Sequence, residues 1–415
     1  MSIVKRINVN LANSVIVDKG IEVLSILELI ENTNYHEELF DLFNVENYAH
    51  DFIEIKGAEE VVRNLIKIDE EYQKFDVDSY FKNVKVESFI DEKEIILEIN
   101  NIKDPKILKI TGTDMIYVET RYAVRSEYFN ELYNIDKYLD FCKSNRYDDI
   151  VKTNITMLEE KNKNSNKDKK FRLLKSKDGK YFVRALTSTE VYKDYNLRFS
   201  LFIALIELHK LNKYKGHSYY INSYSFTESD AKIVFSQRES FELTDKMKIS
   251  FALELVNDEI KREAVKLNGI FTISLGNGKD IFVRPDDVKT NIVSFSHSVG
   301  IEKVKEKLEN LAEKIDVFTK NMIDDTQKIK NIQNPNTIRE FLLYKIQKSR
   351  TQEISSLYKA DINKLLTNNV DTIFQLFEVF NKIDLLIDDE HIVAKDFWRH
   401  KLYQALVEGG KDGSK

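Results

Sequence analysis

Two adjacent carboxylates, Asp286 and Asp287, are the residues of this sequence best placed to bind a catalytic metal ion. They follow a predicted strand and Arg284-Pro285, and Lys289 comes two residues later. A magnesium-dependent nuclease needs carboxylates that converge from separate elements, often with a lysine nearby. Paired acids in a loop are, however, commonplace solvated turns. We therefore predict no catalytic residue, no metal site and no cofactor, and retain Asp286 and Asp287 only as candidates for a nuclease.

Most other catalytic motifs are missing from the chain. There is no G-x-S-x-G nucleophile elbow and no H-E-x-x-H zinc motif, and the seven histidines are scattered without a recurrent metal-ligand spacing. The single cysteine, Cys142, lies on an apolar helix face, where a small buried side chain is a simpler interpretation than a nucleophile. One cysteine cannot form a disulfide within the chain, so we predict a reducing, cytoplasmic setting.

The segment Gly276-Asn277-Gly278 raises the question whether its two glycines cradle a phosphate group. A phosphate loop needs a strand followed by a helix whose amino end faces the phosphate. Here the residues on both sides alternate between apolar and polar types, as they do in a strand. Because glycine and asparagine adopt the positive φ angles of a tight turn, we predict a hairpin turn instead.

The highest concentration of positive charge lies in residues 161–184, which hold eight lysines and two arginines against two aspartates. Cations on a flexible arm and a hairpin suit contacts with phosphates, and aromatic side chains can stack on bases. The alternative is a solvated lysine-rich loop whose aromatic residues point into the core. The residues expected to contact nucleic acid are Lys169, Lys170, Arg172, Lys175, Lys177, Lys180, Tyr181 and Arg184.

A heptad pattern that begins at residue 301 predicts helix with a single apolar stripe. Its apolar residues alternate at spacings of three and four over three heptads. The stripe could pack inside an antiparallel bundle or join two chains as a coiled coil, and the amphipathic helices predicted after it favour the bundle. The candidate interface residues are Ile301, Val304, Leu308, Leu311, Ile315 and Phe318.

The elements that would position these residues fall into three parts and predict an α+β fold. Residues 1–160 form an acidic region of mixed helices and strands, and 161–299 an antiparallel β-rich domain that includes the basic hairpin. Residues 300–408 form an all-helical bundle, and 409–415 a disordered tail.

Local patterns predict several individual elements. Alternation on either side of a DEK turn indicates a hairpin over 84–100, and a second hairpin is expected over 106–120. Asp178-Gly179 indicates the turn of a third hairpin, because this pair adopts the positive φ angles that a type I′ turn requires. Thr337 and Glu340 form a candidate capping box at a helix start.

Three short motifs lie between residues 184 and 300. The first consists of Arg184, Ala185, Ser188, Tyr192, Asp194 and Asn196, the second lies within 257–265, and the third consists of His297, Ser298 and Gly300. Together they resemble the motifs of the phage/plasmid-like proteins of unknown function. The chain departs from that family in three ways: Tyr195 splits the Asp-Asn pair of the first motif, Asp258 and Lys261 replace the usual Ser and Gly of the second, and the family's Cys-Asn-Gly motif is missing. The resemblance covers about residues 171–330 and implies a mobile-element origin rather than an activity.

Charge and hydropathy limit the remaining functions. The net charge of −6 gives no global positive field, and no apolar run approaches 18 residues, so we predict no membrane span. The sequence favours a non-enzymatic cytoplasmic protein of a phage, plasmid or defence locus that binds nucleic acid, preferentially single strands, through its basic hairpin. One alternative is an assembly or inhibitor protein whose heptad stripe holds a partner or a second copy. The other is a metal-dependent nuclease.

Overall fold

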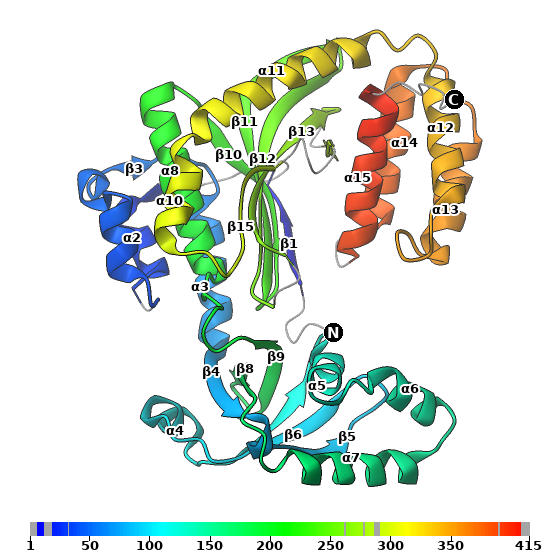
Figure 1. Ribbon diagram of the computed structural model, residues 1–415. Coiled ribbons are helices and arrows are strands. Elements are labelled where there is room, and N and C mark those ends of the chain that lie inside the picture. Colours follow the sequence, from blue (N-terminus) through cyan, green and yellow to red (C-terminus); the bar gives the residue numbers. More distant parts are fainter. Residues whose placement is uncertain are drawn as a thin grey trace.

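Two large β-sheets organise the chain (Figure 1). The computed structural model describes residues 6–11, 19–31, 33–260, 263–276, 279–285, 291–388 and 391–407, and it confirms the predicted α+β fold. One sheet is the centre of the body, which we define as residues 6–71 and 188–330. The other is the centre of the insertion unit, residues 72–187, which interrupts the body. Residues 335–407 form the C-terminal helices.

The body sheet is antiparallel, with the strand order β1-β10-β11-β12-β13-β14, and β15 pairs with the part of β13 that β14 leaves uncovered. Side chains alternate between its two faces. One face carries core residues such as Phe251 and Leu253, and the other carries polar residues such as Glu254 and Asn268. The strands are β1 (Ile7–Asn10), β10 (Tyr219–Phe226), β11 (Asp230–Thr244), β12 (Met247–Asp258), β13 (Val265–Ser274), β14 (Asp280–Val283) and β15 (Asn291–Phe295).

Helix α8 (Leu197–Lys215) covers part of the apolar face. It begins at Asn196, whose Oδ1 accepts the N–H of Phe199 at 2.8 Å, and it ends at Gly216, which has a φ angle of 71°. The amino-terminal elements lie on the same side of the sheet as α8 (Figure 1). They are β2 (Ile21–Glu22), α1 (Val23–Ile26), η1 (Leu27–Leu29), α2 (His36–Leu42), η2 (Val45–Tyr48), β3 (Phe52–Ile53) and α3 (Ala58–Glu71).

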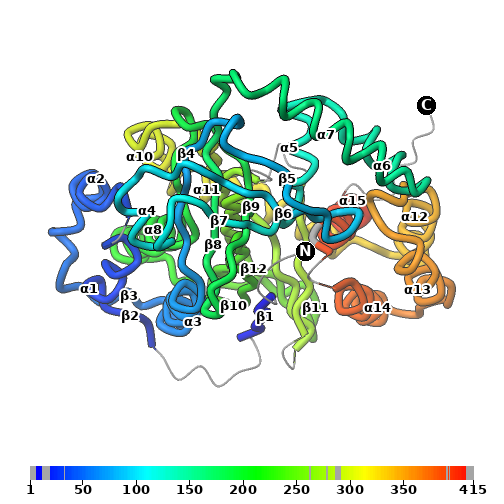
Figure 2. The backbone as a smooth tube through the Cα atoms, turned by 90° about the horizontal axis from the view of Figure 1, so that it is seen from below, coloured from blue at the N-terminus to red at the C-terminus, as the bar shows by residue number. Residues whose placement is uncertain are grey.

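The insertion unit has a six-stranded sheet in the order β4-β8-β9-β7-β6-β5, in which only β7 and β9 run parallel among the described pairs. Helices α5, α6 and α7 enclose its own core, which includes Leu97, Val118 and Phe171 (Figures 1 and 2). The elements are β4 (Tyr72–Tyr80), η3 (Phe81–Asn83), β5 (Val84–Phe89), β6 (Ile95–Ile99), α4 (Pro105–Thr111), β7 (Ile116–Thr120), α5 (Val124–Tyr133), α6 (Asp136–Ser144), α7 (Asp148–Asn162), β8 (Asp168–Ser176) and β9 (Tyr181–Thr187).

The predicted division of the chain near residue 160 falls inside the insertion unit. Strands β8 and β9 come after that boundary, yet they pair with β4 and β7, which come before it. The hairpin over 84–100 is confirmed as β5 and β6. The hairpin over 106–120 is wrong, because Asp104 caps the N–H of Lys106 at 2.7 Å and Pro105 occupies the first turn, which makes α4 helical.

The region predicted to be an all-helical bundle is helical, but its first two helices belong to the body. Helices α10 (Ile301–Glu309) and α11 (Leu311–Lys330) pack against the body sheet, and the C-terminal helices follow. These are α12 (Pro335–Lys348), α13 (Ser356–Thr367), α14 (Ile373–Leu386) and α15 (Ile392–Val407). The predicted capping box is wrong: Asn334 caps α12 through the N–H of Asn336, at 3.0 Å. The predicted tail at 409–415 lies outside the described residues.

Candidate functional site

The predicted basic hairpin is confirmed as β8 and β9, which pair antiparallel on either side of Asp178-Gly179. Gly179 has a φ angle of 81°, which explains the glycine at this turn, but Asp178 does not have a positive φ angle, so the predicted type I′ turn is wrong. Lys177 and Lys180 are exposed beside the turn, where Lys180 forms a solvent-exposed ion pair with Asp178 at 3.7 Å. Lys175 is half-buried, and its Nζ donates to the carbonyl oxygen of Ile110 at 2.7 Å. The tip of the hairpin therefore presents lysines to solvent and is fixed to α4.

The contact with Ile110 brings two further lysines to the hairpin, which no local pattern in the sequence predicts. Lys109 precedes Ile110 in α4, and Lys106 lies one turn earlier; both are exposed. Tyr181 is half-buried on β9, where the Nζ of Lys175 lies 5.5 Å from the centre of its ring. We call Lys106, Lys109, Lys175, Lys177, Lys180 and Tyr181 the hairpin surface.

The two lysines at the other end of β8 do not join the hairpin surface. Lys169 forms an ion pair with Glu131 of α5. Lys170 lies opposite Asp78 of β4 in the sheet register and is half-buried. Both cations therefore have an acidic neighbour within the insertion unit, which weakens their attraction for an added phosphate.

The prediction that Arg172 and Arg184 contact nucleic acid needs correction, because both side chains are buried. Arg184 forms an ion pair with Glu259 at 2.9 Å, and neither side chain of that pair is accessible to solvent. Arg172 donates to Tyr192 Oη at 2.5 Å and forms an ion pair with Asp194. An arginine is buried where carboxylates compensate its charge, so these two side chains have a structural role.

Glu259 is the centre of the contacts between the insertion unit and the body, which we call the junction network. It accepts hydrogen bonds from Lys74 Nζ and from the N–H of Leu197, each at 3.0 Å, in addition to the bond from Arg184. Burial alone would raise the pKa of Glu259, but Lys74, Arg184 and Arg172 outweigh this effect and hold that pKa below its ordinary value. Glu259 therefore remains ionised inside the protein.

The motifs that carry the family resemblance meet at this junction, although up to about a hundred residues separate them in the sequence. The ring of His297 stacks on Tyr192, with a distance of 5.1 Å between ring centres. Asn257 donates to the carbonyl oxygens of Tyr195 and Asn196, both at 2.9 Å. The residues around Glu259 thus come from all three motifs, and their contacts are those of a fixed, buried network.

The heptad stripe packs against the body sheet of its own chain. All six predicted interface residues, Ile301, Val304, Leu308, Leu311, Ile315 and Phe318, are buried. The ring of Phe318 lies 5.4 Å from that of Phe251 and 5.7 Å from that of Phe271. The prediction that these residues form an interface with another chain therefore needs correction, because the sheet already covers the stripe.

The predicted nuclease candidates, Asp286 and Asp287, lie outside the described residues. Within the described ranges, no group of three or more His, Cys, Asp or Glu side chains could hold a metal ion. The turn expected at Gly276 is confirmed, because β13 and β14 pair on either side of it and Gly276 has a φ angle of 80°. Cys142 is buried, as its helical position suggested.

Comparisons of the chain with protein families, with curated proteins and with solved structures give no match. The resemblance to the phage/plasmid-like proteins therefore stays a prediction. In the part of the chain that the structure describes, none of the helices has the length and apolar character needed to cross a membrane.

Proposed function

We propose that this protein binds nucleic acid through the hairpin surface. The observation that supports it best is the contact between Lys175 and Ile110, which places the exposed Lys109 of α4 beside the lysines of the hairpin tip. The hairpin surface then holds five lysines from α4 and the hairpin, together with a partly exposed tyrosine ring that Lys175 contacts. Lysines at a surface attract phosphates without regard to sequence, and an aromatic ring can stack on a base of a single strand.

The setting of this function is also a proposal. A cytoplasmic protein of a phage, plasmid or defence locus fits the single buried cysteine and the resemblance of the three motifs. We propose a non-enzymatic binding protein, with cleavage by Asp286 and Asp287 as the alternative that the same experiment examines.

Fluorescence anisotropy with a labelled single strand and the matching duplex tests the proposed function. The full chain is titrated at two salt concentrations with magnesium present, and the probe is then run on a gel. We expect salt-sensitive binding to an intact probe. The triple variant Lys109→Ala, Lys177→Ala, Lys180→Ala should bind more weakly, with a log–log salt dependence lower by about 2, since each contact to a single strand contributes about 0.7.

A matched control removes the same charge from another part of the molecule. Lys303, Lys320 and Lys364 are exposed on α10, α11 and α13, and their triple Ala variant should bind as the unaltered protein does. Equal binding by the two triple variants would overturn the proposed surface. A cleaved probe would instead support the nuclease alternative.

A second candidate function is assembly with a protein partner or a second copy through the C-terminal helices. The buried heptad stripe cannot supply this surface, but large apolar side chains on these helices are exposed. Tyr344, Leu357, Leu385 and Val393 are 56%, 72%, 74% and 64% exposed. If these side chains hold two copies together, light scattering will give a mass above one chain, and Leu357→Asp with Leu385→Asp will reduce it. A single-chain mass at high concentration would exclude self-association.

A further inference from the structure

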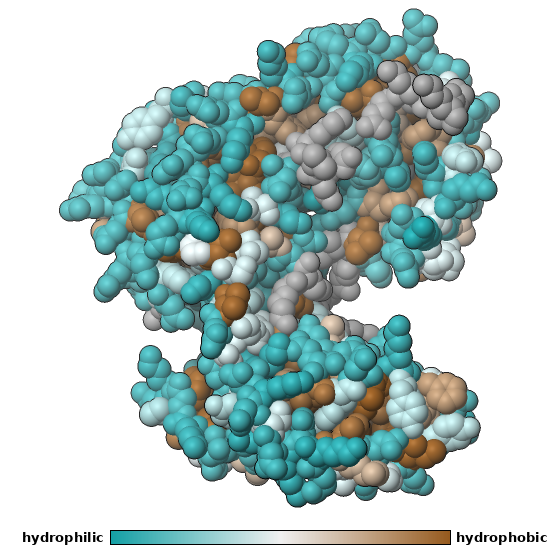
Figure 3. Space-filling model, viewed as in Figure 1, coloured by the Kyte–Doolittle hydropathy of each residue, from teal (hydrophilic) through white to brown (hydrophobic). Residues whose placement is uncertain are grey.

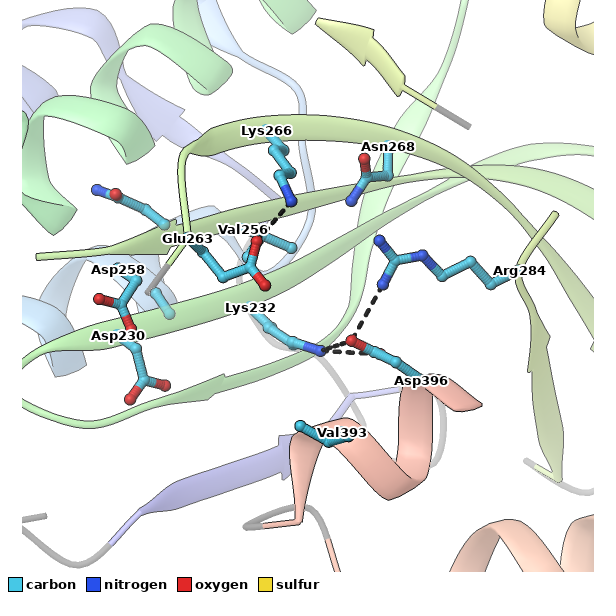
Figure 4. Close-up of a pocket in the computed structure, with 12 residues that line it drawn as sticks. Asp230, Lys232, Val256, Asp258, Glu263, Lys266, Asn268, Arg284, Val393 and Asp396 are labelled. Atoms are coloured by element: carbon cyan, nitrogen blue, oxygen red, sulfur yellow. Dashed lines mark hydrogen bonds and ion pairs between the residues drawn. The ribbon is translucent and has the colours of Figure 1, made fainter. Parts of the chain in front are cut away.

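A pocket lined mainly by charged and polar residues, with Val256 and Val393 among them, lies between the body sheet and α15, on the face of the sheet opposite the main core (Figure 4). Its volume is about 140 Å³. A cavity of about this size holds one benzene molecule, whereas drug-sized ligands occupy roughly 300–1,000 Å³. The pocket therefore suits one compact chemical group, either alone or as part of a larger molecule.

The strand register explains why cations gather around the pocket. Lys232 of β11 and Lys266 of β13 both lie opposite Val256 of β12, one on each side. Neighbouring strands are about 4.8 Å apart, so the two lysines rise from the sheet about 10 Å from each other with Val256 between them. Asn268 follows Lys266 on the same face, because side chains two residues apart point the same way. Figure 4 shows these side chains and Arg284 directed toward a common space.

Two carboxylates reach the same space, and each is already paired. Asp396 of α15 accepts bonds from Lys232 Nζ at 3.0 and 3.1 Å and forms an ion pair with Arg284 at 3.1 Å. Glu263 accepts a bond from Lys266 Nζ at 2.5 Å. Burial alone would raise the pKa of Asp396, but the neighbouring cations lower it below its ordinary value, so Asp396 is ionised.

The other two acidic residues of the lining are held elsewhere. Asp230 forms an ion pair with Arg6 at 2.5 Å, and Asp258 accepts the backbone N–H of Ile260 at 2.8 Å. Both lie at one end of the pocket in Figure 4. The lining therefore has three cations and four carboxylates, and with Arg6 beside Asp230 the charges around the pocket balance.

Hydrogen-bond donors in the central space outnumber their partners among the described residues. Each lysine ammonium has three donors, of which Lys266 uses one, on Glu263. Asn268 is only 1% exposed, and its Nδ2 has no hydrogen-bond partner within the described ranges. A buried donor left without an acceptor costs about 1–3 kcal/mol, so a ligand that supplies oxygen atoms here would be stabilised.

We propose that this pocket binds a phosphate group. The ammonium of Lys266 and the amide of Asn268, side by side on β13, offer several donors to the space, and a phosphate has more oxygen atoms to accept them than a carboxylate has. Arg284 and Lys232 hold Asp396 at one wall, while Lys266 and Asn268 supply the donors that reach the ligand. The phosphate can belong to a small phosphorylated molecule or to the end of a nucleic acid, and this site does not depend on the hairpin surface.

Isothermal titration calorimetry of the full chain at constant ionic strength tests the proposal, with inorganic phosphate as the first probe. The variants are Asn268→Asp, which keeps the shape and replaces donors by a negative charge, and Lys266→Met, which keeps the length and removes the charge. We expect each to weaken phosphate binding at least tenfold. Lys248→Met, at an exposed position of β12 in the same sheet, is the matched control and should bind as the unaltered protein does.

Further probes identify the source of the phosphate. Tighter binding of ribose 5-phosphate than of inorganic phosphate would indicate a small phosphorylated molecule. A gain in affinity on adding a 5′-phosphate to a short oligonucleotide would indicate a nucleic-acid end. The hairpin triple variant should bind inorganic phosphate normally, which separates this site from the proposed function.

Two results would overturn the phosphate site. One is the absence of binding heat with every phosphate probe. The other is an unchanged phosphate affinity in the Lys266→Met variant. Lys266 is half-buried at the edge of the pocket, so this variant should fold even if Asn268→Asp does not. Circular dichroism of each variant shows that the fold is retained.

Discussion

Glu259 shows at the residue scale how one buried side chain joins two parts of a protein. Its carboxylate receives Arg184 from β9, Lys74 from β4 and the N–H of Leu197 at the start of α8. Charges persist inside a protein only where they are paired and hydrogen-bonded. The attachment of the insertion unit therefore depends on a carboxylate, and replacing it by a neutral side chain lowers the free energy of unfolding.

Glu259→Gln should lower the free energy of unfolding by about 3–5 kcal/mol, because it leaves Arg184 and Lys74 buried without their counter-charge. Denaturant unfolding followed by circular dichroism measures this change. Glu306→Gln, at an exposed position of α10, is the control and should change stability by less than about 0.5 kcal/mol. Similar losses in both variants would contradict the role assigned to the junction network.

The stability of the unaltered protein and that of Glu259→Gln should depend differently on pH. The pKa of Glu259 lies below its ordinary value of 4.5, so in acid the unfolded chain binds a proton that the folded chain does not. The stability contributed by this carboxylate is therefore complete above pH 4.5 and is lost as the pH falls below it. We expect the difference between the unaltered protein and Glu259→Gln to shrink by up to about 1.4 kcal/mol for each pH unit below 4.5. A difference independent of pH would refute this.

At the element scale, the ring of Phe318 packs α11 against Gly269 of the body sheet. A Cβ atom built on Gly269 of β13 would come within 2.6 Å of the Phe318 ring. This glycine is therefore required by close approach of a side chain and not by a turn. The polar face behind it is available for the pocket because α11 uses only the apolar face.

Gly269→Ala should destabilise the protein by about 1–3 kcal/mol, because the added methyl group displaces the ring of Phe318. Thermal or denaturant unfolding measures the change. Phe318→Leu removes the ring, so the double variant should be more stable than the sum of the two single losses implies. Additive losses would show that the methyl group meets something other than Phe318.

The element scale also shows what the sequence could and could not predict. Asp178-Gly179 predicted its hairpin correctly because turn signals are local. The heptad stripe predicted helices correctly but not their partner, because an apolar stripe does not specify whether a helix or a sheet covers it. Arg172 and Arg184 were expected at the surface because their partners, Asp194 and Glu259, become neighbours only after folding.

The pocket was missed for a related reason. Its side chains come from β11, β12, β13, the end of β14 and α15, and the charged ones look like ordinary surface residues in their own segments. Likewise the insertion unit was divided near residue 160 because the pairing of β4 with β8 spans about a hundred residues. Long-range strand pairing leaves no local signal in the sequence.

At the scale of the whole molecule, the described residues form two large cores that are separate. The core of the insertion unit includes Leu97, and the core of the body includes Leu253. The space-filling view shows the molecule hollowed between the insertion unit and the C-terminal helices (Figure 3). The insertion unit and the body meet at the junction network. Parts with separate cores can open independently.

Leu97→Ala should therefore lower the stability of the insertion unit by about 2–5 kcal/mol and leave the body protected. Hydrogen exchange followed by mass spectrometry measures both parts in one sample. Leu253→Ala is the matched control, with the loss of protection expected in the body. A single loss of protection across the whole chain in both variants would show that the two cores unfold together.

The position of the insertion unit in the sequence also determines which of the two sheets can form first during translation. Every strand of its sheet lies within residues 72–187, so this sheet can form as soon as that stretch has left the ribosome. The segment before it must wait, because Ile7 of β1 pairs with Phe226 of β10. At about 5–20 residues per second, that delay is roughly 10–40 s. During translation the first strand thus finds its partner only after the whole insertion unit has been made.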